Sequence, residues 1–460
     1  MTTVPLLQSV HDAVAWLRER VTGTLQTDSR QIRPGDGFIA WPGAATDGRA
    51  HIGDALSRGA VACLVEHEGV EAFALQGLPV AALHGLKAAT GLIAADWFDQ
   101  PTQRLDVLAV TGTNGKTSTS WWLAEALNVL SKNELIAQGG CALVGTLGMG
   151  TPPALTSTGM TTPDPVRLQR AFQQFADAGR TACAIEASSI GLAEHRLAGT
   201  QIRVGVFTNF TQDHLDYHGS MADYWLAKRA LFAWPGLRTA VINIDDPAGA
   251  ALHAELVQRG DGAADGAALD LWTVSATGPA RIAARNIAAA EAGLQWLVVE
   301  GAEQHLLQSR VVGHYNVLNL LGVVATLRSL GVPFTLEGED LHLTREGGHS
   351  ARRIAHVTDA TGAAVQRTLI DVVRSTPGIT LFEQHTLVDL ITTRKLGLPG
   401  NRCLGLYALD SDTDEVVTFR APQTILATGG AGKVYLYTTN PDTATGDGIA
   451  AAWRAGCRVA

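Results

Sequence analysis

The sequence contains few cysteines, no long hydrophobic run and no recognisable targeting segment. Its longest apolar run, residues 317–327, contains Asn319 and is too short to span a bilayer. The N-terminus lacks the basic region of a signal peptide, and Asp12 interrupts its apolar stretch. We therefore expect a cytoplasmic protein without membrane insertion. The cysteines are odd in number and show no C-x-x-C spacing, which argues against a zinc site: Cys63, Cys141, Cys183, Cys403 and Cys457.

Charged residues are also scarce. They make up 17% of the 460 residues, against 46% hydrophobic residues, which is typical of globular chains rather than disordered ones. The formal net charge of −9 argues against general binding to nucleic acid. A chain of this length should form about two to four domains.

Residues 107–127, VLAVTGTNGKTSTSWWLAEAL, are the most informative stretch. Residues 107–110 have the length and β-branched content of a buried strand, and apolar residues recur at helical spacing after the loop. In such a loop, backbone N–H groups and the helix N-terminus bind phosphate, a lysine neutralises it and a threonine holds Mg²⁺. The match to G-x-x-x-x-G-K-[ST] is imperfect, because Val110 stands where that pattern has glycine, and an ordinary turn with a solvent-facing lysine is the alternative. We predict a nucleotide site formed by Gly112, Thr113, Asn114, Gly115, Lys116, Thr117 and Ser118.

Acidic residues and histidines follow two further predicted strands. Glu186 ends the apolar run 181–185, and His214 lies in the polar run 209–218 after the strand 204–208. Ligands bind at the carboxyl ends of parallel strands, where such oxygen ligands suit Mg²⁺. A solvated glutamate and a plain polar loop remain the alternatives for these two segments. For Lys228, in the predicted helix 221–232, surface exposure is the default interpretation.

The remaining pattern predicts an α/β fold. Residues 1–100 alternate short strands, helices and glycine turns, as in a small N-terminal α/β domain. Residues 101–336 predict a P-loop-type domain with a mostly parallel sheet, strand-like alternation over 271–310 and an apolar helix from 313 to 330. Residues 258–269 are rich in glycine, alanine and aspartate, and predict a flexible loop.

Seven ordered stretches between about residue 25 and residue 335 resemble the Mur ligase family, most closely its MurE type. They are DSRQIRPGDGFIAWPG, VTGTNGKTSTS, TSTGMTTPDP, IEASSIGLAEHRLAG, TNFTQDHLDYHGSMADYWLAKRALF, NIDDPAG and GHYNVLN. The resemblance implies an ATP-dependent ligase of peptidoglycan precursor synthesis. ATP would convert a carboxylate of UDP-MurNAc-L-Ala-D-Glu into an acyl phosphate, which the amine of meso-diaminopimelate or lysine then attacks.

The resemblance also implies residue roles. Lys116 and Thr117 would contact the ATP phosphates and Mg²⁺, and Glu186 and His214 would be magnesium ligands. Lys228 lies where the family carries a carbamylated lysine, whose carboxylate-like group helps to bind Mg²⁺. The adenine would lie near Asn316 and Asn319, and the UDP-muramoyl dipeptide would be held by Ser29, Thr161, Thr162, Ser189 and Arg196. The chain departs from the family at Ile190 and Tyr315, where many members have histidine.

The resemblance ends near Leu336, and the family's DNPR-like specificity motif does not occur in the sequence. Residues 341–460 instead resemble flavoproteins of the succinate dehydrogenase/fumarate reductase group, such as L-aspartate oxidases. Glu346 falls at a substrate-contacting position of that group, and residues 428–430 and 445–448 match FAD-contacting stretches. Residues 131–140 resemble another segment of the same group, which suggests a hybrid chain with a flavoprotein-like part over 337–460.

The flavin site itself looks incomplete. No G-x-G-x-x-G follows a strand, so the usual turn for the FAD pyrophosphate is missing and we expect no bound FAD. Two other functions remain open. One is an FAD-dependent oxidase that uses the C-terminal part, and the other is a non-catalytic nucleotide-binding hybrid.

Overall fold

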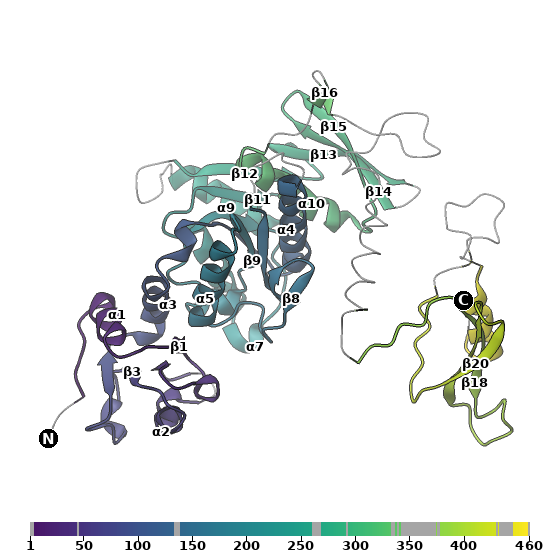
Figure 1. The fold of residues 1–460 in the computed structure, drawn as a ribbon. Helices are drawn as coiled ribbons and strands as arrows, with labels where there is room; N and C mark the ends of the chain where they lie inside the picture. The colour runs from purple at the N-terminus through teal and green to yellow at the C-terminus, as the bar shows by residue number, and fades with distance from the viewer. Residues whose placement is uncertain are drawn as a thin grey trace. The chain divides into compact units, whose positions relative to one another are not determined.

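The computed structural model describes residues 4–43, 46–132, 139–259, 268–290, 293–332, 336–337, 340–341, 374, 378–428, 431 and 445–458. The chain divides into two compact units, residues 1–359 and residues 360–460, which are described separately below (Figure 1). Within the described ranges, no helix combines the length and the hydrophobicity that a bilayer-spanning segment needs. The predicted domain boundaries at residues 100 and 336 stay predictions.

The first part of the larger unit is a parallel sheet in the order β1-β2-β3-β4. Its strands are buried on both faces, because α1 and α3 cover one face and α2 covers the other. Asp28 and Asp47 cap short 3-10 turns with their carboxylates, as the turn chemistry predicts. The elements are α1 (Val10–Arg18), β1 (Leu25–Gln26), β2 (Gly37–Ala40), α2 (Ile52–Ser57), β3 (Ala62–Glu66), β4 (Val80–Leu83) and α3 (Leu86–Trp97).

The second part is a sheet of eleven strands in the order β15-β14-β13-β12-β11-β10-β5-β9-β6-β7-β8. The strands from β6 to β13 in this order pair in parallel, whereas β7, β8, β14 and β15 are antiparallel additions. The strands are β5 (Asp106–Thr111), β6 (Cys141–Gly145), β7 (Gly148–Thr151), β8 (Ala154–Thr156), β9 (Ala182–Glu186), β10 (Ile202–Phe207), β11 (Thr239–Asn243), β12 (Asp270–Ser275), β13 (Ile282–Ala290), β14 (Gly293–Glu300) and β15 (Glu303–Ser309).

Helices cover both faces of this sheet. One apolar cluster joins a face to α4 and α10, which lie side by side in Figure 1, and a second cluster joins the other face to α5 and α9. The helix α5 begins with Asp164 as its N-cap and Pro165 at its first position, a favourable helix start. The helices are α4 (Lys116–Lys132), α5 (Pro165–Asp177), α6 (Ser189–Ala193), α7 (Leu215–His218), α8 (Met221–Arg229), α9 (Pro247–Arg259) and α10 (His314–Ser329).

The predicted α/β fold class is confirmed, with differences at the ends of elements. The helix predicted over 221–232 ends at Arg229 and continues as a 3-10 turn, Ala230–Ala233. The loop predicted over 258–269 begins later, because α9 extends through Arg259. Residues 260–267 lie outside the described residues, as do residues 133–138 of the flavoprotein-like segment 131–140.

The smaller unit contains an antiparallel sheet, β18-β19-β20, with the helix α12 packed on β18. Leu390, Ala451 and Ala455 form its small buried core. The predicted flavin-site residues Glu346, Gly429 and Gly430 lie outside the described residues. The elements are β18 (His385–Thr392), β19 (Cys403–Asp410), β20 (Glu415–Arg420) and α12 (Asp447–Arg454); the strands β16 (Leu336–Glu337) and β17 (Asp340–Leu341) belong to the larger unit.

Helix α3 of the N-terminal part packs against residues 198–199 of the second part so closely that there is no room for a side chain at Gly91 or Gly199. A Cβ atom added at Gly91 would lie 2.2 Å from the carbonyl oxygen of Ala198. One added at Gly199, which has φ +77°, would lie 2.4 Å from the carbonyl oxygen of Gly91. The obstructing atoms belong to the backbone, so they cannot rotate away as a flexible side chain would.

We expect the substitution Gly91→Ala to destabilise the larger unit by about 1–3 kcal/mol, the usual cost of overpacking. Urea unfolding followed by far-ultraviolet circular dichroism measures this change. Gly53→Ala in α2 is the control, because nothing lies within 4 Å of its added Cβ. The control should be neutral or stabilising by up to about 1 kcal/mol. Equal effects of the two substitutions would contradict the close packing at α3.

Candidate active site

In the loop between β5 and α4, the side chain of Lys116 folds back onto two backbone carbonyls of the loop itself. The Lys116 ammonium donates hydrogen bonds to the carbonyl oxygens of Gly112 and Thr113, both at 2.9 Å. A Cβ atom at Gly112, which has φ +144°, would lie 1.9 Å from the Thr208 hydroxyl oxygen. At Gly115, with φ +85°, it would lie 2.5 Å from the side-chain oxygen of Asn319. Both positions therefore favour glycine by conformation, and Gly112 also by space.

Glu186 lies beside this loop at the end of β9, and its residue is 1% exposed. The Thr117 hydroxyl donates to Glu186 Oε2 at 3.0 Å. The Thr146 backbone N–H donates to Oε1 at 2.8 Å, and the Thr146 hydroxyl donates to Oε2 at 3.2 Å. The predicted pair Thr117 and Glu186 is thus brought together. Thr146 was missed by the sequence analysis, although its place directly after β6 is a strand-end position that could have indicated it.

The segment after β10 carries Asn209, Thr211 and His214 and contacts the loop from its other side. The Asn209 side-chain oxygen accepts from the Asn114 backbone N–H at 2.9 Å. The Thr211 N–H donates to the Thr113 hydroxyl at 2.9 Å. His214 itself adopts φ +50°, an uncommon conformation for a residue with a side chain.

The predicted metal ligands do not form a closed site. The His214 side chain is 41% exposed, and its Nε2 lies 3.6 Å from Asp213 Oδ2. Within the part of the chain that the structure describes, no group of three or more histidine, cysteine or acidic side chains surrounds a common point. Glu186 and His214 therefore supply separate candidate ligands.

Lys228 is 1% exposed, which makes the surface interpretation of this residue wrong. Its Nζ donates to the Gly112 carbonyl oxygen at 2.7 Å and lies 4.4 Å from the centre of the Tyr224 ring. Burial lowers the pKa of Lys228 to about 7, and the neighbouring Lys116 acts in the same direction. Burial also lowers the pKa of Lys116, against the opposing effect of Glu186 and Asp213.

Tyr224 was not predicted as a site residue. It is fully buried, and its hydroxyl lies 3.2 Å from the Thr113 hydroxyl. Its spacing of four residues from Lys228 places both side chains on one face of α8, which was the available signal.

A cavity of about 580 Å³ lies between the loop, the ends of β10 and β11, and the start of α10. Its lining includes both predicted adenine-site residues, Asn316 and Asn319, whose side chains hydrogen-bond each other at 3.2 Å. The exposed Tyr315 also lines it. The rest of the lining comes from Asn114, Gly115, Ser118, Thr208, Asn209, Thr211, Asn243, Asp245, Asp246 and Leu318.

Four of the five predicted substrate residues gather beside Glu186. The Thr161 hydroxyl lies 3.1 Å from that of Thr146, and the Thr162 hydroxyl donates to the Glu186 carbonyl oxygen at 2.8 Å. The Arg196 guanidinium donates to the Thr162 carbonyl oxygen at 3.0 Å. The Ser189 hydroxyl lies 3.0 Å from His218 Nε2. The fifth residue, Ser29, belongs to the N-terminal sheet, where its hydroxyl donates to Asp54 Oδ2 at 2.9 Å.

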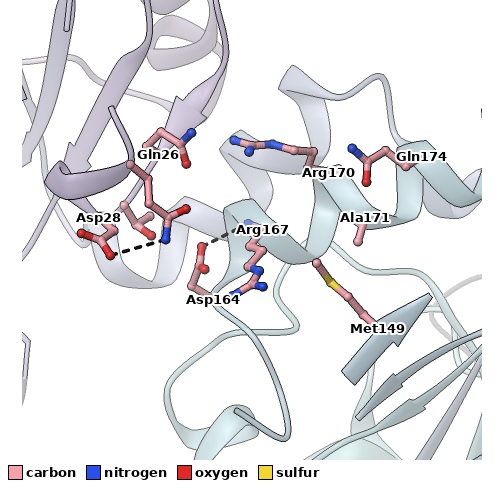
Figure 2. Close-up of a pocket in the computed structure, with 10 residues that line it drawn as sticks. Gln26, Asp28, Met149, Asp164, Arg167, Arg170, Ala171 and Gln174 are labelled. Atoms are coloured by element: carbon pink, nitrogen blue, oxygen red, sulfur yellow. Dashed lines mark hydrogen bonds between the residues drawn. The ribbon is translucent and has the colours of Figure 1, made fainter. Parts of the chain in front are cut away.

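A second cavity, of about 250 Å³, lies between β1 with its following turn and α5 (Figure 2). Arg170 on α5 donates a hydrogen bond to the carbonyl oxygen of Leu25, and the Arg167 guanidinium donates to the carbonyl oxygens of Ser157 and Thr158 at 3.3 and 3.2 Å. Both arginines thus hold backbone segments in place. The lining residues are Gln26, Thr27, Asp28, Gln31, Met149, Asp164, Arg167, Arg170, Ala171 and Gln174.

Comparison with known proteins assigns the larger unit to a family. The description "Mur ligase middle domain" matches residues 110–327, and "Mur ligase family, catalytic domain" matches residues 23–88. A UDP-N-acetylmuramoyl-L-alanyl-D-glutamate–2,6-diaminopimelate ligase of Pseudomonas aeruginosa is 40% identical over 356 residues, which cover 75% of this chain and 70% of that protein. The chain belongs to the Mur ligase family.

Other Mur ligases support this assignment. The ligase of the same name from Acidovorax sp. (strain JS42) is 70% identical over 333 residues, covering 72% of this chain and 65% of that protein. A solved structure of a ligase of this name has a TM-score of 0.57 at 30% identity, covering 67% of this chain and 60% of that one. The chain thus spans less than two thirds of the length of these two relatives.

The C-terminal part matches a different family. The description "FAD binding domain" matches residues 309–460, which supports the hybrid character expected from the sequence. The Xylella fastidiosa ligase of the same name nevertheless aligns with 98% of this chain at 33% identity, covering 84% of that protein.

The buried amine of Lys228 gives a prediction about pH. The folded chain holds this amine with a pKa of about 7, against 10.5 for the ordinary group, so the unfolded chain binds one more proton between these values. The free energy of unfolding should therefore rise with pH in this window, by up to about 1.4 kcal/mol per pH unit from this group. Lys228→Met removes this contribution.

The measurement compares urea unfolding of the unchanged chain and Lys228→Met at pH 7, 8 and 9 in buffers freed of CO₂. The stability difference should shift with pH in favour of the unchanged chain. Lys132→Met, at the exposed end of α4, is the control and should show no such trend. A difference that stays constant across this range would contradict a buried neutral amine.

Proposed function

We propose that the chain is an ATP-dependent ligase that joins an amino acid to a UDP-muramoyl dipeptide. The observation that carries the proposal is the convergence of Lys116, Lys228, Thr117 and Glu186 around one glycine loop at the carboxyl edge of a parallel sheet. Such an edge is where this kind of fold binds nucleotides. The substrate class comes from the relatives named above, which are UDP-N-acetylmuramoyl-L-alanyl-D-glutamate–2,6-diaminopimelate ligases.

The nucleotide would lie across the loop and the larger cavity. Its phosphates would meet the N–H groups of residues 112–118 and the amino end of α4, where Lys116 neutralises their charge. To do so, Lys116 exchanges its hydrogen bonds to Gly112 and Thr113 for bonds to phosphate oxygens. The adenine would enter the cavity lined by Asn316 and Asn319, whose amides can donate to and accept from a purine edge.

The residues present fit Mg²⁺. Glu186 offers a buried carboxylate and Thr117 a hydroxyl, and both are oxygen ligands of the kind that Mg²⁺ prefers. His214 is a third candidate, and Lys228 a fourth once its amine has reacted with CO₂ to give a carbamate. When bound, Mg²⁺ would neutralise charge on the phosphate oxygens.

The reaction has two steps. A carboxylate oxygen of the dipeptide forms a bond to the γ-phosphorus of ATP while the bond to ADP breaks, which gives an acyl phosphate. The amino nitrogen then attacks the acyl carbon, phosphate leaves with the bonding electron pair, and the nitrogen loses a proton. Lys116 would stabilise the negative charge of the phosphate oxygens during the transfer. Thr161, Thr162, Ser189 and Arg196 would orient the dipeptide.

The direct test is phosphate release from ATP by the full chain with UDP-MurNAc-L-Ala-D-Glu and either meso-diaminopimelate or L-lysine. Release that requires all three substrates, with a tripeptide product in mass spectrometry, is the expected result. Binding of ATP and dipeptide without turnover would favour the non-catalytic hybrid instead.

Lys116→Ala should weaken binding of Mg·ATP by about 1.5–3 kcal/mol, roughly 10- to 100-fold in Kd, because it removes a charged hydrogen-bond donor from the phosphates. Isothermal titration calorimetry measures this change. Lys132→Ala, at the other end of α4, is the matched control and should leave the affinity unchanged. Equal affinities of the unchanged chain, Lys116→Ala and Lys132→Ala would contradict the assignment of residues 112–118 as the phosphate-binding loop.

The carbamate on Lys228 has its own test. A neutral amine is the form that reacts with CO₂, and burial lowers the pKa of Lys228 far enough to supply it near neutral pH. Carbon-13 NMR with labelled bicarbonate should show a carbamate signal that is absent from Lys228→Ala. Without that signal, Lys228 would act in the loop as an amine only.

A flavin function is the second candidate, because the FAD binding domain description matches residues 309–460. We predict that the purified chain nevertheless carries no flavin and does not oxidise aspartate. The glycine turn that opens α4 carries Lys116 and Thr117, which suit a nucleoside triphosphate. A visible flavin absorbance band that survives desalting and bleaches with aspartate would reverse this ranking.

A further inference from the structure

One carboxylate connects helix α3, which covers the N-terminal sheet, to residues 209–218, the segment that carries His214. Glu194 is the C-cap of α6 and uses both of its oxygens. Its Oε2 lies 2.8 Å from the ammonium of Lys87 on α3, and its Oε1 accepts a hydrogen bond from the Tyr217 hydroxyl on α7. Although burial opposes it, these two donors hold the pKa of Glu194 below its ordinary value, so the carboxylate is charged at neutral pH.

The helix α7 depends on such external contacts. It has four residues, Leu215–His218, and a single turn is not stable by itself in water. Two of its side chains bond to α6: Tyr217 to Glu194, and His218 Nε2 to the Ser189 hydroxyl at 3.0 Å. These two bonds tie α7 to α6, and α6 is tied to α3 through Lys87. Helix α7 also packs on α8, where the rings of His218 and Tyr224 lie 5.2 Å apart.

The position of α7 in turn fixes His214. This residue is the N-cap of α7, and its φ of +50° persists only if neighbouring contacts hold the chain on both sides. On the preceding side, Thr211 bonds to Thr113 of the phosphate loop. On the following side, the Tyr217 hydroxyl is bonded to Glu194.

We propose that Lys87, Glu194 and Tyr217 are positioning residues that couple the N-terminal domain to the nucleotide site, by setting the loop of His214. This inference rests on the proposed function, in which residues 112–118 hold the nucleotide, and on the substrate role that the family resemblance implies for Ser29 in the N-terminal part. Binding at one site would then tighten binding at the other, and the coupling would be reciprocal.

The first experiment measures this coupling by calorimetry. The Kd of a magnesium-bound, non-hydrolysable ATP analogue is determined with and without saturating UDP-MurNAc-L-Ala-D-Glu. We expect the dipeptide to tighten binding roughly 5- to 150-fold in the unchanged chain. In Tyr217→Phe and in Lys87→Met the factor should fall below about two-fold, and Lys87→Arg, which keeps the charge, should retain most of it.

The control is Arg203→Met, which breaks a comparable ion pair with Asp106 at 2.6 Å, at the opposite end of β5 and β10. It should leave the coupling unchanged, whereas a general loss of stability would lower the coupling in all variants. Full coupling in both Tyr217→Phe and Lys87→Met, or its absence from an unchanged chain that binds both ligands, would overturn the inference while leaving the proposed function intact.

A second experiment needs no ligand. Hydrogen exchange followed by mass spectrometry should show peptides covering residues 209–218 exchanging at least about ten-fold faster in Tyr217→Phe and Lys87→Met, with the rest of the central sheet unchanged. Unchanged exchange in this segment would overturn the inference. If neither ligand binds while exchange increases as expected, the proposed function fails and the mechanical link from Lys87 to residues 209–218 stands.

Discussion

The site depends on one backbone carbonyl, that of Gly112, which accepts hydrogen bonds from the buried Lys228 and the partly buried Lys116. Two ammonium groups that bond to the same oxygen atom repel each other, and burial increases the free-energy cost of each charge. Burial, together with the neighbouring Lys116, lowers the pKa of Lys228 to about 7, so that its neutral amine form is accessible near neutral pH. In the proposed function, phosphates beside Lys116 and a carbamate group on Lys228 would each bring negative charge that reduces this repulsion.

The strand, glycine loop and helix that form the proposed nucleotide site were predictable from the sequence because each requirement is local. A strand, two glycines, a lysine and a helix start lie within residues 107–127, and the structure places each where the pattern indicates. Glu186 was predictable for a similar reason, since it ends an apolar run. The family resemblance named Lys228 as a site residue, but its burial was not predictable from its own segment. A lysine on a helix is exposed unless the fold covers it, and here Gly112, distant in sequence, and Tyr224 cover it. Thr146 escaped notice because its partner, Glu186, is forty residues away.

Two family descriptions match different parts of the chain. The Mur ligase description ends at residue 327 and the FAD binding description begins at residue 309, so the two overlap over 309–327. Most of this overlap is the first part of α10, which packs on the central sheet and carries Asn316 and Asn319 of the cavity. On structural grounds α10 therefore belongs to the ligase part. The smaller unit has its own sheet and its own small core, and it presents apolar side chains such as Ile425 and Trp453 at its surface.

The crossing of Gly91 with Ala198 and Gly199 fixes α3 against the turn that follows α6. Backbone atoms meet there with no side chain between them, so α3 can neither slide along this turn nor roll over it without a clash. Lys87 lies one turn of α3 away from Gly91, and its partner Glu194, at 2.8 Å, lies four residues before Ala198. The crossing and the ion pair therefore hold the same two segments together, one through shape and the other through charge.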